Sequence, residues 1–177
     1  VDVSVEDDGV IIKYLDRGET REESARCLIV TTGSNFALHR KAGLLPPDNF
    51  LWGSRVEFEE KSNGPLEIFI LNDPDMGPFG WVIPINNKTR IGTISEEYDR
   101  GALYNLVQKN NGRFVLDRCK IEGAPIACGN SRKMVSDRVI SAGEAAGQVK
   151  TTTGGGIHYG LVGADLAFEV LKKAEDD

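Results

Sequence analysis

Residues 143 to 157 hold the glycines and the acidic side chain that give this sequence its clearest chemical potential. Glu144 can accept hydrogen bonds from sugar-like hydroxyl groups, and the small residues after it let another molecule approach the backbone closely. A helix that begins near Gly156 would present free N–H groups and the positive end of its dipole to a negatively charged group. The predicted binding residues are Gly143, Glu144, Ala145, Ala146, Gly147, Gly154, Gly155, Gly156 and Ile157.

A dinucleotide that carries a polyol, as FAD does, combines the hydroxyl groups and the negative charge that this stretch could bind. Two other nucleotide-binding patterns, G-x-x-x-x-G-K-[ST] and G-x-G-x-x-G, are absent from the sequence. Taken alone, the three glycines also fit a simpler interpretation, in which they only let a helix pack tightly against a strand. Both interpretations stay open at this point.

A short strand and a long helix are expected on either side of this stretch. Val139 and Ile140 form a short buried strand that delivers the chain to Gly143. After Gly156 a helix is expected to run to about Ala174, and its apolar residues recur at steps of three and four, so they form one stripe. This stripe consists of Ile157, Leu161, Ala164, Phe168 and Leu171.

The first 30 residues contain two patterns of apolar residues, and each pattern predicts a different kind of strand. Apolar and polar residues alternate over residues 1–5 and 10–14, and a third strand is expected within residues 20–26, which together make an antiparallel meander. The continuous apolar run 27–30 is typical of a strand buried on both faces of a parallel sheet. A short helix is expected over residues 35–43.

From residue 50 onward the pattern becomes antiparallel, with one helix from about Tyr98 to Lys109. That helix should end at the helix-stopping run Asn110, Asn111 and Gly112. The four strands are expected around residues 56–58, 66–70, 79–84 and 90–94.

The order of these elements predicts a mixed fold, α+β in the middle and α/β at the two ends. Residues 1–48 would supply the meander and a returning strand, and residues 49–133 an antiparallel domain. Residues 134–177 would return to the first part with a strand, a loop and a helix. The two ends of the chain should therefore pack together.

Composition excludes several classes of protein. The 177 residues carry a formal net charge of −6, and the absence of a basic cluster argues against nucleic-acid binding. No run of apolar residues is long enough for a transmembrane helix. The cysteines lack metal-ligand spacing and fit a reducing cytoplasm, so neither a disulfide framework nor a metal site is predicted. They are Cys27, Cys119 and Cys128.

Neither histidine is assigned a chemical role. His39 stands beside Arg40 and Lys41, and we expect it on the surface. His158 is the second residue of the helix expected after the glycine run, and a structural role is favoured for it over a place beside a cofactor.

Three stretches resemble the geranylgeranyl reductase family of FAD-dependent oxidoreductases. Residues 139–157 are similar to its second FAD-binding motif, an apolar strand followed by G-[DE]-A-A-G and t-G-G-G-I, although Thr151 stands where Pro is usual. Residues 79–92 resemble the family's substrate-domain pattern Y-x-W-x-F-P…G, with Phe79 in place of Tyr. Residues 25–34 resemble the strand that follows the meander in these flavoproteins.

The resemblance implies a partial FAD/NAD(P)-binding Rossmann-like domain, without its N-terminal βαβ unit, joined to an antiparallel substrate domain. It implies reduction of C=C bonds in a prenyl lipid, with NAD(P)H or another reductant as electron donor. No residue is assigned as catalytic acid. The substrate-binding residues that it implies are Phe79, Trp81, Pro84 and Gly92.

Three alternatives to this function remain at the level of sequence. The chain could come from another flavoprotein, such as a ring hydroxylase, a halogenase or a quinone-linked dehydrogenase. It could instead be a lipid-binding module, or a structural fragment without activity. An apolar face left uncovered would make the chain self-associate, and a lipid substrate would favour peripheral association with a membrane.

Overall fold

The computed structural model describes residues 1–70, 78–98, 100–109, 114–116 and 119–176. The chain divides into two compact units, which are described separately below. The first consists of Val1–Asn49, Ala127–Lys150 and Gly155–Asp177, and the second of Phe50–Ile126 and Thr151–Gly154. The domain bounds predicted from the sequence, 1–48, 49–133 and 134–177, stay a prediction.

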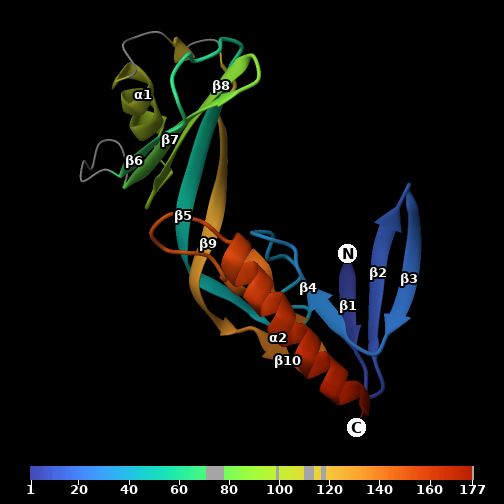
Figure 1. The fold of residues 1–177 in the computed structure, drawn as a ribbon. Coiled ribbons are helices and arrows are strands. Elements are labelled where there is room, and N and C mark those ends of the chain that lie inside the picture. The colour runs from blue at the N-terminus through green and yellow to red at the C-terminus, as the bar shows by residue number, and fades with distance from the viewer. Residues whose placement is uncertain (71–77, 99, 110–113, 117–118, 177) are drawn as a thin grey trace. The chain divides into compact units, whose positions relative to one another are not determined.

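The first unit begins with the expected antiparallel meander (Figure 1). Its strands are β1 (Asp2–Val5), β2 (Val10–Asp16) and β3 (Glu19–Ala25). Arg17 and Gly18, with φ of 52° and 88°, make the two-residue turn between β2 and β3. Two residues with positive φ give a turn whose twist matches that of the flanking strands.

A small sheet joins distant parts of the chain within the first unit. Strand β4 (Leu28–Val30) pairs in parallel with β11 (Val139–Ser141), and β10 (Val135–Ser136) pairs with β11 in the antiparallel sense. The parallel pairing confirms that the two ends of the chain pack together. Strand β4 is less buried than expected, because Ile29 is 46% exposed and only Val30 is fully covered.

The segment 35–43 forms a series of turns, so the predicted short helix is wrong. Its backbone bonds mix three- and four-residue spacings, for example from Gly43 N–H to Arg40 O and from Ala42 N–H to Leu38 O. A nine-residue stretch gains too little from helical hydrogen bonds to be helical by itself. Burial of Ala42 and Leu44 in the core of the first unit fixes its conformation instead.

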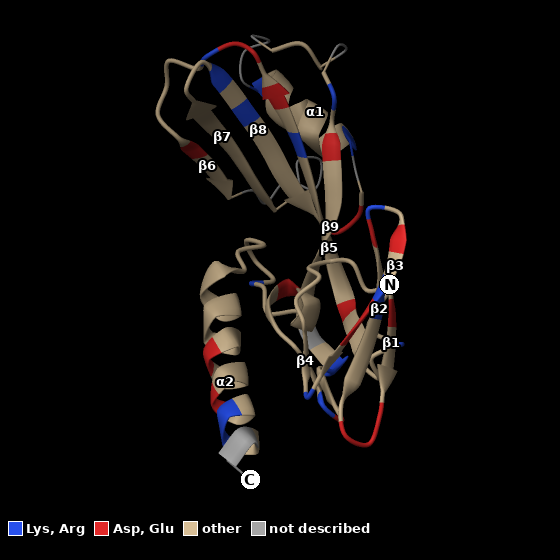
Figure 2. Ribbon diagram, turned by 90° about the vertical axis from the view of Figure 1, so that its right-hand side faces the viewer, with Lys and Arg blue, Asp and Glu red and all other residues tan. Residues whose placement is uncertain are grey.

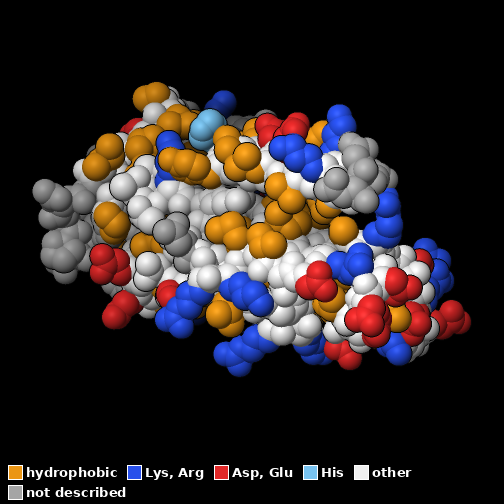
Figure 3. Space-filling model, turned by 90° about the horizontal axis from the view of Figure 1, so that it is seen from below, with side chains coloured by type: hydrophobic (Ala, Val, Ile, Leu, Met, Phe, Trp, Pro, Cys, Tyr) orange, Lys and Arg blue, Asp and Glu red, His pale blue; other side chains and the backbone are white. Residues whose placement is uncertain are grey.

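The long helix α2 (Ile157–Asp176) follows β11 and the glycine-rich stretch, as the sequence predicts. The stretch expected to be a loop begins with a 3-10 helix, η2 (Gly143–Ala146). The predicted apolar stripe of α2 is nevertheless not its buried face. Ile157 is 85% exposed and Phe168 is 62% exposed, whereas Gly163 and Ala167 are buried. Small residues let α2 approach the loop after β11 closely, so its large apolar side chains remain outside. Figure 3 shows hydrophobic side chains spread over the face of the molecule that it presents.

The second unit is built on an antiparallel sheet with the strand order β6-β7-β8-β5-β9. Its core lies between this sheet and helix α1 (Arg100–Lys109), with Val56, Val82, Ile91 and Leu106 among the buried residues. The predicted helix stop at 110–112 lies outside the described residues. The strands of the sheet are β5 (Leu45–Phe58), β6 (Glu67–Ile70), β7 (Phe79–Ile85), β8 (Lys88–Ser95) and β9 (Glu122–Lys133). Residues 45–49 of β5 and 127–133 of β9 are grouped with the first unit.

Two classes of feature are absent from the part of the chain that the structure describes. None of its helices has the length and apolar character needed to cross a membrane. Within the same residues, no three His, Cys, Asp or Glu side chains are grouped so as to hold a metal ion.

Candidate functional site

The carboxyl ends of the two parallel strands converge on one acidic side chain. Gly33 lies shortly after β4, and Glu144 lies shortly after β11. A Cβ atom built at Gly33 would stand 3.8 Å from Oε2 of Glu144. Ligands of α/β sheets bind outside the carboxyl ends of parallel strands, so this is the end of the sheet where a ligand is expected.

Glu144 is held in place, and the backbone beside it is open. Its Oε1 accepts a hydrogen bond from the backbone N–H of Ala127 at 3.2 Å. Gly143 has φ of 68°, which favours glycine, and a Cβ built there would meet nothing within 4 Å. The space beside Gly143 therefore leaves its backbone accessible to a bound molecule, which is what a dinucleotide site at this position requires.

The other residues of the predicted motif shape the loop from inside. Ala145, Ala146 and Gly147 are buried. Gly147 has φ of 70°, and a Cβ there would lie closer than 3.0 Å to the carbonyl oxygen of Gly129. Only glycine fits this position without a backbone shift, so Gly147 is needed for the path of the loop.

Gln148 forms hydrogen bonds within this loop, and its side chain contacts α2. Its side-chain Oε1 accepts a hydrogen bond from the N–H of Gly143 at 2.7 Å, and its own N–H donates to the Gly143 carbonyl at 3.1 Å. The same side chain lies against Gly163 of α2. Gln148 was not predicted as a site residue, although it directly follows the Gly143–Gly147 part of the motif.

His39 is buried beneath the same loop, so its predicted place on the surface is wrong. Its side chain is 0% exposed, and its Nε2 lies 2.8 Å from the carbonyl oxygen of Ala145. The ring also packs edge-on against Phe36, with 4.9 Å between centroids. The contact joins residues 106 positions apart, and the neighbouring Arg40 and Lys41 gave no local signal of burial.

The three glycines before α2 have different surroundings. Gly155 accepts a hydrogen bond from Lys150 N–H at 3.1 Å, and Gly156 accepts one from Gly160 N–H at 2.8 Å in the first turn of α2. Both belong to the first unit. Gly154, with φ of 65°, is grouped with the second unit, where Ile94 and Ile126 leave no room for a Cβ.

Trp81 lies across Gly92 on the sheet of the second unit. The two residues are cross-strand partners on β7 and β8, and a Cβ at Gly92 would lie closer than 3.0 Å to the indole ring. Phe79 is on the same face, with its ring centroid 6.0 Å from that of Trp81. Pro84 is three residues from Trp81 along the strand, so its side chain belongs to the opposite face.

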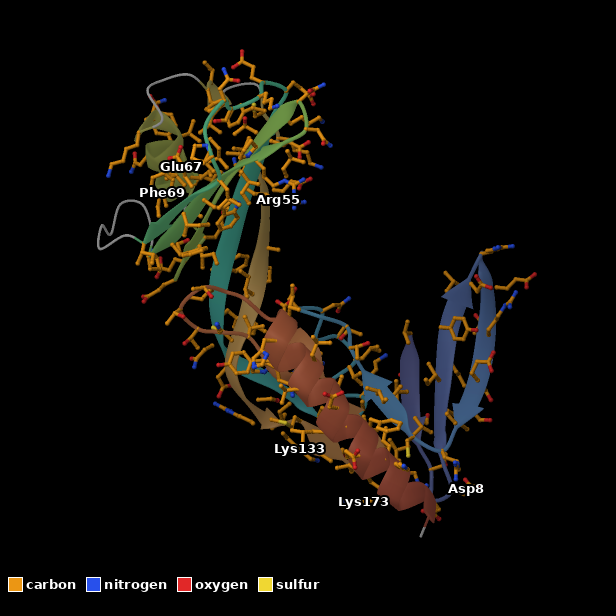
Figure 4. All side chains as sticks on the ribbon, viewed as in Figure 1. Asp8, Arg55, Glu67, Phe69, Lys133 and Lys173 are labelled. Carbon is orange, nitrogen blue, oxygen red and sulfur yellow. The ribbon has the colours of Figure 1, made fainter. Side chains whose placement is uncertain are left out.

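A cavity of about 370 Å³ opens beside Trp81. Most of its lining is small or apolar, and Arg55 and Glu122 provide its charged groups. Glu122 Oε2 accepts hydrogen bonds from Nη2 and Nε of Arg55 at 2.7 and 2.9 Å. Figure 4 labels Arg55 on β5. The lining residues are Gly53, Ser54, Arg55, Trp81, Glu122, Gly123, Ala124 and Ile126.

Charged side chains continue along the same sheet beyond the cavity. Figure 2 shows Lys and Arg positions beside Asp and Glu positions on the strands around β8. Glu57 accepts hydrogen bonds from Arg90 at 2.8 Å and from Lys88 at 3.0 Å, and these bonds hold the pKa of its carboxyl group below the ordinary value. The hydrogen bonds and charge of Arg55 lower the pKa of Glu122 in the same way.

Several curated sequences similar to this chain are named digeranylgeranylglycerophospholipid reductase, and two examples are reductases 1 of two different organisms. The one from Methanothermobacter thermautotrophicus is 29% identical, over 95% of this chain and 45% of its own length. The one from Methanopyrus kandleri is also 29% identical, over 97% of this chain and 50% of its own length. The chain thus spans about half the length of these relatives, and no protein-family model matches it.

Solved structures share the fold at lower sequence identity. A geranylgeranyl bacteriochlorophyll reductase-like protein from Thermoplasma acidophilum superposes with a TM-score of 0.78 and 19% identity. The match covers 99% of this chain and 48% of that one. A flavin-dependent halogenase matches with a TM-score of 0.59 and 18% identity, over 85% of this chain and 31% of its own.

The mixed fold, with its parallel pair and antiparallel sheet, is shared with these solved structures, and the predicted fold class is confirmed. Over almost all of its length the chain is similar to proteins named digeranylgeranylglycerophospholipid reductase. The resemblance predicted from three stretches of sequence is therefore confirmed by relatives that match almost all of the chain.

Proposed function

We propose that this chain forms part of an FAD-dependent oxidoreductase that reduces C=C bonds of a prenyl lipid. The observation that carries the proposal is the convergence of β4 and β11 on Glu144, beside the open backbone of Gly143. A carboxylate fixed at the carboxyl ends of two parallel strands is suited to the hydroxyl groups of a dinucleotide. The names of the relatives support the choice of reaction.

The residues of the first unit would share the binding of FAD. Glu144 would accept hydrogen bonds from hydroxyl groups, and the absence of a side chain at Gly143 would let the cofactor lie against the backbone. The start of α2, after Gly155 and Gly156, would stabilise negative charge by about 1 kcal/mol per contact. When bound in its reduced form, the flavin would supply the hydride and solvent would supply the proton for each C=C bond, and NAD(P)H or another reductant would return the oxidised flavin to its reduced form.

The second unit would bind the hydrocarbon chain. Trp81 and Phe79 offer aromatic surface on one face of the sheet, and Ala124 and Ile126 extend the apolar lining of the cavity. Burial of apolar area contributes about 25 cal/mol per Å², so an isoprenoid chain gains affinity along such a surface. A substrate of this kind resides in membranes, and we propose peripheral membrane association for the whole protein.

A second candidate substrate follows from Arg55. Its guanidinium group lines the same cavity, and a small aromatic acid could bind it if the carboxylate displaced Glu122. This chemistry would suit a ring-modifying flavoprotein, and the halogenase fold is compatible with it. We favour the lipid because Arg55 is already hydrogen-bonded to Glu122 and because most of the cavity lining is small or apolar.

The test uses the protein expressed from the longest reading frame that contains this sequence. It is incubated anaerobically with FAD, dithionite and vesicles of an unsaturated prenyl phospholipid, and the lipid is analysed by mass spectrometry. We expect a mass gain of two hydrogen atoms for each reduced double bond, and loss of that gain in Trp81→Ala. A protein that binds FAD and leaves the lipid unchanged, yet turns over an aromatic acid, would contradict the lipid assignment.

A further inference from the structure

Among the described residues, the imidazole of His39 makes one polar contact, and that contact is with the loop proposed to hold FAD. Its Nε2 lies 2.8 Å from the carbonyl oxygen of Ala145 in η2. The side chain is completely buried, and its Nδ1 has no hydrogen-bond partner among the residues that the structure describes. A buried polar group without a partner costs free energy, so the histidine carries a cost that an apolar residue would not.

The partner atom determines which tautomer is present. A carbonyl oxygen can only accept, so the proton of the neutral imidazole must be on Nε2 for this bond to form. The ring therefore acts as a donor of fixed direction, held on one side by its edge-on packing with Phe36. An apolar side chain of similar size would fill the same space and leave the Ala145 carbonyl without this donor.

The loop is thus held from two sides. Gln148 bonds to Gly143 at the first position of η2 and contacts α2, and His39 bonds to Ala145 at the third position from beneath. Glu144 lies between these two attachment points. Because η2 is only four residues long, a change in the direction of the Ala145 carbonyl would also turn the backbone that carries Glu144.

We infer that His39 is a positioning residue, which fixes the direction of Glu144 by donating a hydrogen bond to the Ala145 carbonyl. The expected effect of His39 on FAD affinity rests on the proposed function. The expected effect of His39 on the conformation of the loop does not depend on that function. The two parts can therefore be tested separately.

The loop is tested on this 177-residue chain by hydrogen–deuterium exchange of the amides of residues 143–148. His39→Leu removes the donor, and His39→Gln keeps an N–H at the end of a chain of similar reach. Val10→Ala, a change at a fully buried residue in the core of the same unit, is the control for a general loss of stability. We expect His39→Leu to speed exchange at these amides by roughly tenfold, the effect of losing one hydrogen bond.

His39→Gln should restore slow exchange at the amides of residues 143–148. Val10→Ala should not speed exchange at these amides more than elsewhere in the unit. Unchanged exchange in His39→Leu would overturn the inference. It would also be overturned if His39→Leu and Val10→Ala sped exchange equally throughout the unit, with no rescue by glutamine, because His39 would then be only a core residue.

The cofactor part uses the protein from the longest reading frame. The dissociation constant for FAD should rise by roughly tenfold in His39→Leu and return close to its original value in His39→Gln. An unchanged dissociation constant in His39→Leu would overturn this part. A parent protein that binds no FAD would contradict the proposed function, while the exchange experiment would still decide whether His39 positions the loop.

Discussion

The side-chain amide of Gln148 lies against the α-carbon of Gly163 so closely that a Cβ atom at residue 163 would overlap with it. The same amide oxygen accepts the hydrogen bond from Gly143 N–H at 2.7 Å. Helix α2 therefore reaches the loop after β11 through a glycine, and the loop is closed by the side chain that the glycine accommodates. This relationship explains why the buried face of α2 consists of small residues.

Substitution of Gly160 and substitution of Gly163 in α2 should change the stability of the protein differently. Gly→Ala within a helix stabilises by about 0.5–1 kcal/mol. Gly160→Ala should gain this amount, because its Cβ would lie 3.6 Å from Gly143 Cα, an ordinary contact. Gly163→Ala should show no gain, because it displaces Gln148 from Gly143 and loses about 1 kcal/mol of hydrogen bonding. The shift in melting temperature of each variant measures the difference, and equal stabilisation by both would contradict the contact.

Gly92→Ala should disturb the second unit. The new methyl group would overlap with the Trp81 ring and would lie 2.9 Å from the carbonyl oxygen of Ser54, which cannot move freely. Overpacking of this kind costs about 1–3 kcal/mol. In a Trp52→Phe background, the emission of Trp81 should shift to longer wavelength as the ring becomes exposed. Gly64→Ala, where a Cβ has room, is the control, and an unchanged spectrum in Gly92→Ala would refute the stacking.

Lowering the pH should reduce the stability that the ion pairs of Glu57 with Arg90 and Lys88 contribute to this sheet. The bonds from Arg90 and Lys88 lower the pKa of Glu57 in the folded state, so the unfolded state binds protons more readily as the pH falls. The contribution of Glu57 is therefore present above the unfolded pKa of a glutamate, about 4.3, and is lost as the pH falls through the lower folded value. Glu57→Gln should flatten the fall in melting temperature below about pH 4.3, the unfolded pKa of a glutamate.

The control for this effect is Glu96→Gln, a change at an exposed residue after β8. It should leave the pH profile of the melting temperature nearly unchanged. Added salt should reduce the difference between Glu57→Gln and the original protein, because the ion pairs are exposed to solvent. A parallel pH profile for all three proteins would rule out a contribution from Glu57.

The exposed stripe of α2 should make this chain self-associate. Ile157, Leu161 and Phe168 are each more than half exposed, and large apolar patches promote association. Sedimentation velocity should show a concentration-dependent species larger than the monomer. Leu161→Glu combined with Phe168→Glu should shift the protein toward monomer, whereas Leu15→Glu, at an exposed residue of β2, should not. A monomer at every concentration would contradict this prediction.

The local pattern of apolar residues was sufficient to predict most helices and strands, but not which of their faces are buried. The alternation at Val10 and Ile12 and the apolar run at Val139 predict strands that the structure contains, and the glycine-rich stretch ends in the expected helix. The predicted apolar stripe on α2 exists but is not the face that the helix buries, because hydrophobic periodicity ignores glycine. At Gly160 and Gly163 the packing surface is the backbone itself, and this has no signature in apolar spacing.

The contacts that position the residues of the candidate site could not be predicted from local sequence either, because they join residues far apart in the chain. Glu144 could be identified from its neighbours in the sequence, but its proximity to Gly33 depends on the parallel pairing of β4 with β11. His39 is bonded to Ala145 across 106 positions, and nothing in the residues beside it indicates burial. Contacts of this kind are set by the topology of the fold, which residue spacing alone does not specify.

Glu144 and Gly143 are proposed to hold part of FAD, and the visible absorption spectrum of the protein from the longest reading frame is the decisive measurement. We expect flavin bands in the purified protein or after incubation with FAD and removal of the excess. Glu144→Ala should weaken FAD binding by about tenfold or more, the cost of losing a hydrogen bond to a charged group. A protein that stays colourless after incubation with FAD would contradict the account.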